Sequence, residues 1–283
     1  MNGELANSYT CCAKIARQAA SSFYFSFFLL PRPQRQAMCA LYAFLRKTDD
    51  LGDSPQPVAE RKAALEQWRW QLDAAFNGKM YDPIFPALVD TTRRYDIPIA
   101  LYRDVLDGVG MDLLPRRFDT FEDLKHYCHL VASVVGLACI QVWGCQDESA
   151  SLPARQCGIA FQLTNILRDL REDALRGRIY LPLEDLRRFD YSQQDLLSGV
   201  CDDRFRQLIR FEIERAEGYY QQATQLAPYL APKGRRAFGA MLATYRGLLD
   251  EIARRDTELL RSRVSLTKWR KMKIVAGWAL APR

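Results

Sequence analysis

Apolar residues recur every three or four positions along most of the chain, whereas the period-two alternation of a half-buried strand is nearly absent. This spacing predicts helices throughout, separated by proline- or glycine-containing stretches. The predicted helices cover residues 34–49, 58–76, 82–95, 97–113, 121–143, 150–174, 202–227, 234–260 and 266–280. No repeat, low-complexity tract or flexible linker divides residues 1–283. We therefore expect one all-α domain, a single bundle of roughly ten helices around a central cavity.

Two stretches are apolar enough to raise the question of a membrane span. Residues 21–31 are too few to cross a bilayer, and residues 131–145 are few and include Ser and Gln, so both are interpreted as buried helix or pocket wall. The N-terminus lacks the basic-then-apolar order of a signal peptide, which favours a cytoplasmic protein. The basic, aromatic segment 268–280 suits either a terminal helix packed on the domain or peripheral contact with the inner face of a membrane.

Composition and charge narrow the classes of partner. Of 283 residues, 48% are hydrophobic and 26% are charged, which is ordinary for a globular protein. Lys and Arg outnumber Asp and Glu by 40 to 34, an excess that suits small anions or an acidic lipid surface and does not require nucleic acid. The eight cysteines form no CxxC pair, so we expect them to be reduced and structural.

Acidic residues gather at the end of the first long predicted helix, in the sequence LYAFLRKTDDLGD. Asp49 and Asp53 are four residues apart and share a helix face with Arg46, and Asp50 lies beside them. Carboxylates at this spacing repel each other, and acids near a helix C-terminus oppose its dipole, so a compensating cation is expected. Gly52, which is unfavourable inside a helix, is expected to let the chain leave the helix at Asp53.

A second acidic pattern lies on the predicted helix 150–174. Asn165, Asp169 and Asp173 repeat at four-residue intervals with Gln162 on the same side, while the opposite positions are apolar. Arginines interleave with them at positions 168, 171, 176 and 178. Either pattern alone also suits a solvated helix face with Arg–Asp pairs, but two patterns about 120 residues apart, both on apolar helices, favour a shared cavity.

Two rows of carboxylates that face one cavity suit the binding of a diphosphate through metal ions. Mg²⁺ takes oxygen ligands, typically one or two carboxylates together with phosphate oxygens, and Mn²⁺ is an alternative. Arginine holds the remaining phosphate oxygens, and the metal stabilises diphosphate as a leaving group. An aromatic, apolar cavity beside such a site suits a hydrocarbon tail and a developing carbocation.

Taken together, these motifs resemble the squalene/phytoene synthase family of head-to-head prenyl transferases. The family's order and spacing are matched, over nearly the whole chain, by SSFYFSFFLLP, ALYAFLRKTDDLGD, YCHLVASVVGL, QLTNILRDLREDALRGRIYLP and YRGLLDEI. The resemblance implies an all-α isoprenoid-synthase fold in which both acidic motifs bind Mg²⁺. One departure is Leu45, where the family usually has Cys, and we expect a packing change there.

The resemblance also implies roles for individual residues. The implied metal ligands are Asp49, Asp50, Asp53, Asn165, Asp169 and Asp173. The implied diphosphate-binding residues are Arg46, Arg168, Tyr245 and Arg263, with Ser22 and Phe23 close to the substrate. The implied catalytic residues are Arg46, Tyr42, Tyr127, Tyr180 and Gln162.

The implied reaction begins when Mg²⁺ and arginine help one allylic diphosphate to ionise. The C2=C3 double bond of a second molecule then attacks C1 of the cation, and proton loss closes a cyclopropane. The base is either a tyrosine or the released diphosphate. Some members stop at this cyclopropylcarbinyl diphosphate, and others ionise it again and lose a proton or accept hydride from NADPH.

The segment YCHLVASVVGLACIQVWG most resembles bacterial presqualene diphosphate synthases of squalene and hopanoid biosynthesis, which predicts two farnesyl diphosphates as substrates. The alternatives are a phytoene synthase of carotenoid biosynthesis, which condenses two geranylgeranyl diphosphates, and a full squalene or dehydrosqualene synthase. Pocket depth, through residues such as Phe27 and Cys39, separates C15 from C20 substrates.

Two further expectations concern cofactor and assembly. The chain has no GxGxxG fingerprint and lacks the C-terminal extension and membrane anchor of eukaryotic squalene synthases, so built-in NADPH reduction is not expected. A monomer and a weak dimer both stay open. A different class of function is a non-catalytic relative that binds prenyl diphosphates, and the intact acidic residues of both motifs speak against it.

Overall fold

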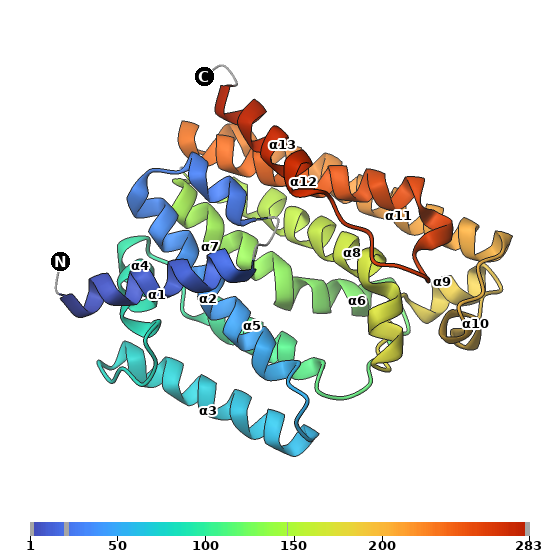
Figure 1. Cartoon of the computed structure of the whole chain (residues 1–283), viewed down its shortest axis with the longest axis horizontal. Coiled ribbons are helices and arrows are strands. Elements are labelled where there is room, and N and C mark those ends of the chain that lie inside the picture. Colours follow the sequence, from blue (N-terminus) through green and yellow to red (C-terminus); the bar gives the residue numbers. More distant parts are fainter. Residues whose placement is uncertain (1–2, 20–22, 146, 281–283) are drawn as a thin grey trace.

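The structure, a computed structural model, describes residues 3–19, 23–145 and 147–280, and most of them are helical (Figure 1). The α-helices are α1 (Gly3–Ala19), α2 (Arg32–Gly52), α3 (Val58–Phe76), α4 (Phe85–Arg94), α5 (Ala100–Met111), α6 (Phe121–Cys128), α7 (Val134–Trp143), α8 (Ser151–Leu175), α9 (Leu183–Arg188), α10 (Gln193–Ser198), α11 (Asp203–Ala223), α12 (Pro232–Arg254) and α13 (Lys268–Leu280). Shorter helical turns are η1 (Tyr24–Leu29), η2 (His129–Ser133), η3 (Glu148–Ala150), η4 (Thr224–Tyr229) and η5 (Asp256–Glu258). Strand-like pairing in these ranges is limited to an isolated antiparallel bridge between Cys145 and Leu230. The predicted all-α class is confirmed.

The apolar spacing predicts the long helices better than it predicts their interruptions. The segments expected at 34–49, 58–76 and 150–174 correspond to α2, α3 and α8. The segment expected at 121–143 is divided by η2, a π-helical turn between α6 and α7. The pattern does not predict α1, because this helix buries mainly small or polar side chains such as Ser8, Cys12 and Ala16.

Helix α8 lies in the middle of the bundle, where it packs against η2, α7 and α11 (Figure 1). A Cβ added to Gly158 would lie 2.5 Å from the backbone nitrogen and Cα of Ser133 in the π-helical turn. A Cβ on Gly136 of α7 would lie 2.7 Å from the carbonyl oxygen of Ala154 in α8. The two helices therefore meet backbone to backbone, which is possible only where the side chain is a hydrogen atom.

The end of α2 is fixed by close packing. Gly52 is the last residue of α2, and a Cβ there would lie 2.5 Å from Cγ1 of Val109 in α5, so its small size admits α5. The chain leaves the helix at Asp53, as the sequence predicts, and the contact with Val109 is a further reason for glycine at this position. Arg61 of α3 donates to the carbonyl oxygens of Gly52 at 2.8 Å and Leu113 at 3.1 Å. This guanidinium ties the ends of α2 and α5 together.

The most apolar stretch of the sequence is a wall of the central cavity. Phe121–Trp143 is long and apolar enough to cross a membrane by length and composition, and half of its most apolar window is buried inside the fold. Val131, Val135 and Cys139 of this stretch line the cavity. The interpretation of residues 131–145 as pocket wall is confirmed.

Among the described residues all eight cysteines are free thiols. Burial raises the pKa of Cys39 to about 11 and that of Cys139 to about 12, so both thiols stay protonated near neutral pH. These cysteines serve as small apolar packing groups, as the sequence predicts.

The C-terminal helix packs along α12, as one of the two sequence interpretations predicts (Figure 1). The indole ring of Trp278 occupies the space where Gly239 would carry a Cβ, and Ile274 lies against Gly247. Trp278 and Ile274 therefore form the inner face of α13, and its outer face points away from α12.

A buried cluster of three charged residues joins α9 to α11. Arg215 donates to Asp185 at 2.7 and 3.1 Å and to Glu212 at 2.7 Å, and its guanidinium lies 4.1 Å from the centroid of the Phe121 ring. One guanidinium here faces two carboxylates. Burial and the nearby Asp185 carboxylate raise the pKa of Glu212 to about 8, although Arg215 opposes the shift.

We predict that Glu212→Gln stabilises the protein more as the pH rises. A folded-state pKa above the unfolded value means that wild-type stability falls between about pH 4.5 and 8, because the unfolded chain ionises Glu212 more readily. Gln keeps a hydrogen-bond acceptor and carries no charge. The Tm difference between variant and wild type should grow by about 3 °C or more from pH 5 to pH 9.

The matched control for Glu212→Gln is Glu217→Gln on the same helix. Glu217 pairs with Arg246 at 3.0 Å near the surface, so its loss should change Tm little at any pH. A Tm change of equal size at pH 5 and pH 9 for Glu212→Gln would contradict the raised pKa of Glu212.

Candidate active site

A cavity of about 740 Å³ lies among the central helices. Its charged and polar lining comes from α2 and α8, from the residue after α5, and from α13 with the segment before it: Arg46, Asp49, Asp112, Gln162, Asn165, Arg168, Arg263 and Lys271. Its apolar lining comes from η1 and the residue before it, from earlier positions on α2 and α8, and from α7 and α12: Phe23, Phe27, Met38, Leu41, Trp143, Cys157, Phe161, Met241 and Leu248. The two halves of the cavity therefore differ sharply in polarity.

The three aspartates of the first acidic motif lie in three different environments. Asp49 lines the cavity, and enclosure by protein together with the nearby Asp53 carboxylate raises its pKa to about 7. Asp50 pairs with Arg46 at 2.6 Å, is 55% exposed, and is not among the residues that line the cavity. Tyr42 and Arg46 line the cavity with Asp49.

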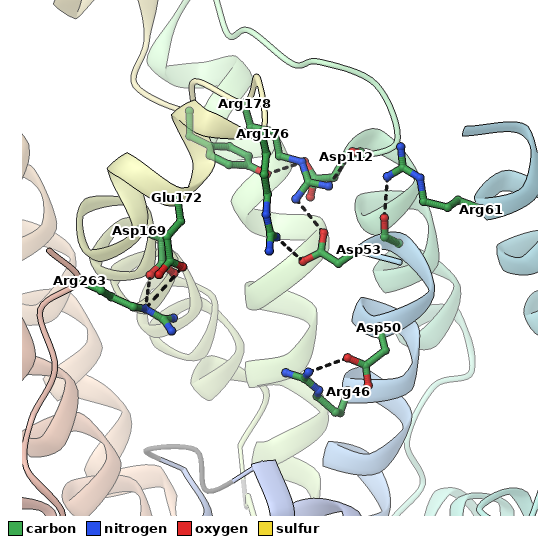
Figure 2. A network of polar contacts seen from close by, with 12 residues as sticks. Arg46, Asp50, Asp53, Arg61, Asp112, Asp169, Glu172, Arg176, Arg178 and Arg263 are labelled. Carbon is green, nitrogen blue, oxygen red and sulfur yellow. Dashed lines mark hydrogen bonds and ion pairs between the residues drawn. The ribbon is translucent and has the colours of Figure 1, made fainter. Parts of the chain in front are cut away.

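Asp53 connects the two acidic motifs. It caps the end of α2 and receives a hydrogen bond from Arg178 at 2.8 Å and one from Arg176 at 2.9 Å (Figure 2). Both arginines belong to the segment that follows α8, more than 120 residues away in the sequence. The ends of α2 and α8 are therefore joined by two ion pairs.

The second motif places its polar residues on the opposite wall. Gln162, Asn165 and Arg168 of α8 line the cavity. Asp169 accepts from Arg168 at 2.8 Å and from Arg263 at 2.8 Å, and Figure 2 shows the contact with Arg263. Burial and the neighbouring Asp169 raise the pKa of Asp173 to about 7.

An aromatic wall of three stacked rings forms part of the cavity lining. The Tyr245 ring stacks on Phe161 at a centroid distance of 4.3 Å and on Phe23 at 4.9 Å, and all three residues line the cavity. Ser22, which the sequence places beside them, lies outside the described residues. Cys39 is buried but does not appear in the cavity lining, where Met38 lies instead, together with Phe27.

The architecture and this arrangement can be compared with known proteins. The sequence profile described as squalene/phytoene synthase matches residues 16–270. The chain belongs to the squalene/phytoene synthase family. It is therefore a prenyltransferase of isoprenoid biosynthesis by family.

Sequence relatives of this family member include named phytoene synthases. The 15-cis-phytoene synthase of Synechococcus elongatus is 41% identical over 280 residues, which cover 95% of this chain and 91% of the relative. Phytoene synthase 1, chloroplastic, of Zea mays is 36% identical and matches 95% of this chain and 67% of its own length.

Solved structures of the family share the fold. A crystal structure of a dehydrosqualene synthase in complex with ligand is 30% identical, with a TM-score of 0.89 over 97% of this chain and 96% of that one. A crystal structure of squalene synthase from Alicyclobacillus acidocaldarius is 28% identical, with a TM-score of 0.83 over 91% of this chain and 97% of that one. The predicted isoprenoid-synthase fold is confirmed.

Asp112 is a cavity residue of this squalene/phytoene synthase family member that sequence reasoning missed. It accepts from the Tyr127 hydroxyl at 2.6 Å and from the Tyr180 hydroxyl at 2.7 Å, and the two rings stack at 5.2 Å. Arg178 donates to its backbone oxygen at 3.0 Å (Figure 2). Burial raises the pKa of the Asp112 carboxyl, against the hydrogen bonds from both tyrosines. Its position at the end of α5 opposes the helix dipole, as Asp53 does on α2, and that signal could have revealed it.

Lys271 is a second missed residue. It lines the cavity beside Arg168 and Arg263, and burial together with the charges of those arginines and Lys268 lowers its pKa. Three cationic side chains therefore converge on one part of the cavity, which is the arrangement that an anionic group would stabilise. The sequence places Lys271 in a terminal helix, so only the tertiary fold brings it to the site.

The donor atoms present fit a divalent cation that also contacts a bound anion. The buried Oδ1 atom of Asn165 has no hydrogen-bond partner in the part of the chain that the structure describes. Asp49 and Asp173 lie among other carboxylates, where a cation would favour their ionised forms. No three His, Cys, Asp or Glu side chains of the described residues are placed to hold a metal by themselves. The oxygen donors of Asp49, Asn165 and Asp173 are of the type that Mg²⁺ prefers, and Mg²⁺ commonly combines a few such ligands with phosphate oxygens.

We predict that Asp112→Asn slows turnover without unfolding the protein. An amide offers one acceptor oxygen, so one of the two tyrosine hydroxyls must rotate and lose its fixed orientation. The kcat for diphosphate release from a prenyl diphosphate should fall by about 10- to 100-fold while KM changes little, because the defect concerns positioning rather than substrate capture. Steady-state kinetics and Tm would be measured together.

Asp107→Asn on the exposed face of α5 is the control for this variant, because it removes a carboxylate of the same helix outside the cavity. An unchanged kcat for Asp112→Asn, or an equal loss for Asp107→Asn, would show that the Asp112 contacts do not position reacting groups.

Proposed function

We propose that the chain catalyses the Mg²⁺-dependent head-to-head condensation of two geranylgeranyl diphosphate molecules to phytoene, with release of diphosphate. The observation that carries the reaction type is the polarity of one cavity, in which carboxylates and cations lie beside an aromatic, apolar interior. Relatives named phytoene synthase, at up to 41% identity, support the C20 substrate. They favour it over the farnesyl diphosphate expected from the segment YCHLVASVVGLACIQVWG.

Cationic side chains of the cavity hold the diphosphate groups in this proposal. Arg168 and Arg263 donate hydrogen bonds to Asp169, and Lys271 lies beside them. An entering diphosphate offers more acceptor oxygens than one carboxylate, so it replaces Asp169 as their partner. Arg46, on the facing helix α2, reaches the same space.

The side chains that would hold Mg²⁺ are Asp49 and Asp53 at the end of α2 and Asn165, Asp169 and Asp173 on α8. The metal supplies charge neutralisation and stabilises diphosphate as it leaves. Asp53 would join this set if Arg176 and Arg178 turned from its carboxylate to the oxygens of a bound diphosphate. Asp50 pairs with Arg46 outside the cavity lining, so its proposed role is to orient that arginine.

The aromatic wall and the tyrosine pair protect and stabilise cationic carbon. The faces of Phe23, Phe161 and Tyr245 offer negative ring potential to an allylic cation and exclude water from it. The hydroxyls of Tyr127 and Tyr180 both donate to Asp112, and Tyr127 lines the cavity. Proton removal falls to a tyrosine oxygen or to the released diphosphate.

A C15 reaction is the second candidate. The dehydrosqualene synthase structure covers almost the whole chain at 30% identity, which supports farnesyl diphosphate as the alternative substrate. The apolar half of the cavity, with Phe27 and Met38, is the part that would separate the two chain lengths.

We predict that purified protein with Mg²⁺ and geranylgeranyl diphosphate gives phytoene without NADPH. Parallel incubations would use farnesyl diphosphate, each substrate with and without NADPH, followed by mass analysis of the products. Presqualene diphosphate or dehydrosqualene from the C15 substrate, with no turnover of the C20 substrate, would replace the proposal by its alternative. Absence of diphosphate release from both substrates would reject the enzymatic function.

We predict that Asp49→Asn and Asp169→Asn each lower kcat by about 100-fold or more, because each removes a charged ligand from the proposed diphosphate site. Asp49→Asn should leave Tm unchanged or raised without added metal, since this carboxylate lies near the like charges of Asp53 and Asp112. Activity and Tm would be compared with those of Asp107→Asn. A near-normal rate for either cavity variant would contradict its assignment to the metal site.

A further inference from the structure

The outer face of the C-terminal helix α13 carries an exposed apolar stripe. Trp269 is 80% exposed, Leu280 is 87% exposed, and Met272 is also exposed. With Ala276 these positions follow the spacing i, i+3, i+7 and i+11, so they lie along one side of the helix. The opposite side carries Ile274 and Trp278, which pack on α12. The helix therefore has two apolar sides, and one of them lacks cover from α12.

The charge on α13 is entirely positive. Its sequence contains Lys268, Arg270, Lys271 and Lys273 and no acidic residue. Arg270 is taken up by an ion pair with Glu251 at 2.8 Å, and Lys271 lies in the cavity wall. Lys268 and Lys273 are exposed and flank the apolar stripe. A stripe of Trp, Met and Leu between lysines has the composition of a helix that lies in the plane of an anionic lipid interface.

The neighbouring element η1 extends this surface. It packs against both α12 and α13, and its Phe28 is exposed while Arg35 lies 5.6 Å from the centroid of that ring. Inside the same wall, Phe23, Phe27, Leu266 and Lys271 line the cavity. The segment 263–271 and η1 therefore contribute both to the cavity lining and to the exposed surface beside α13.

We propose that the outer face of α13 docks on an anionic lipid bilayer, with Trp269, Met272 and Leu280 in the interfacial layer and Lys268 and Lys273 against lipid headgroups. The docked orientation places the cavity wall next to the bilayer. Hydrocarbon chains then pass between membrane and cavity with little exposure to water. The proposed docking follows from the charge and exposure of α13. It does not depend on which prenyl diphosphate is the substrate.

A second exposed apolar patch offers a built-in comparison. Trp70 of α3 stacks on Tyr81 at 4.9 Å, and both are about half exposed. Paired charges of both signs surround this patch, including Arg69 with Asp107 and Arg103 with Asp73. It lies at the opposite edge of the molecule from α13 (Figure 1). It has no net positive charge to favour anionic lipid, so Trp70 is the matched control for Trp269.

The test is co-sedimentation of the full chain with vesicles of phosphatidylcholine alone and of phosphatidylcholine with about 30% phosphatidylglycerol, at low and high salt. Wild-type protein should bind the anionic vesicles at least tenfold more strongly, and salt should weaken that binding. Trp269→Ser with Leu280→Ser, and separately Lys268→Glu with Lys273→Glu, should each reduce anionic binding by about tenfold or more. Trp70→Ser should bind as wild type does.

Folding and activity distinguish the other outcomes. All variants should keep wild-type Tm, and the variants at Trp269, Leu280 and Trp70 should also keep wild-type turnover of detergent-dispersed substrate, because none of these three side chains lines the cavity. Equal binding to neutral and anionic vesicles, or an equal loss in Trp70→Ser, would overturn the proposal. Light scattering would show whether the variants convert a dimer to a monomer. Such a conversion, with vesicle binding unchanged, would assign the outer face of α13 to self-association instead.

Discussion

Carboxylates near the ends of α2, α5 and α8 lie close together around the polar end of the cavity, and their mutual repulsion makes neighbouring cations necessary. Asp49 and Asp173 have pKa values raised to about 7, because the ionised forms lie among other acids. Arg176 and Arg178 neutralise Asp53, while Arg168 and Arg263 neutralise Asp169. At the polar end of the cavity, Arg46, Arg168 and Arg263 each pair with a carboxylate, and Lys271 adds a further positive charge beside Arg168 and Arg263.

This charge arrangement depends on close backbone packing elsewhere. Gly158 and Gly136 let α8 touch the π-helical turn and α7, and Gly52 lets α2 touch α5. These contacts fix where the C-terminal parts of α2, α5 and α8 end. A π-helical turn next to a functional cavity is a common device for shifting the register of side chains on one helix. Here it divides the helix that carries Tyr127 from the helix that carries Cys139.

Local periodicity explains what the sequence predicts well. The all-α class, the long helices and the placement of Arg46, Asp49, Asn165 and Arg168 on the cavity wall follow from spacing along single helices. Tertiary contacts explain the rest. Asp112 and Lys271 enter the site from α5 and α13, and the π-helical turn arises where α8 presses on α6–α7. The contact of Gly52 with Val109 was not predicted for the same reason, since the two residues are distant in sequence.

Asp169 acts as an internal counter-ion for Arg168 and Arg263, and this has a consequence for ligand exchange. Any anion that takes these two arginines must first displace a carboxylate that is already in position. The cost of displacing Asp169 lowers the affinity of the site for incoming and outgoing anions alike. Tight retention of a small inorganic anion is therefore disfavoured. When the outgoing anion departs, Asp169 returns to the same donors and prevents the arginines from being left unpaired. In the ligand-free protein, Asp169 therefore competes with anions for the two arginines. This competition favours rapid release of an anion over tight binding.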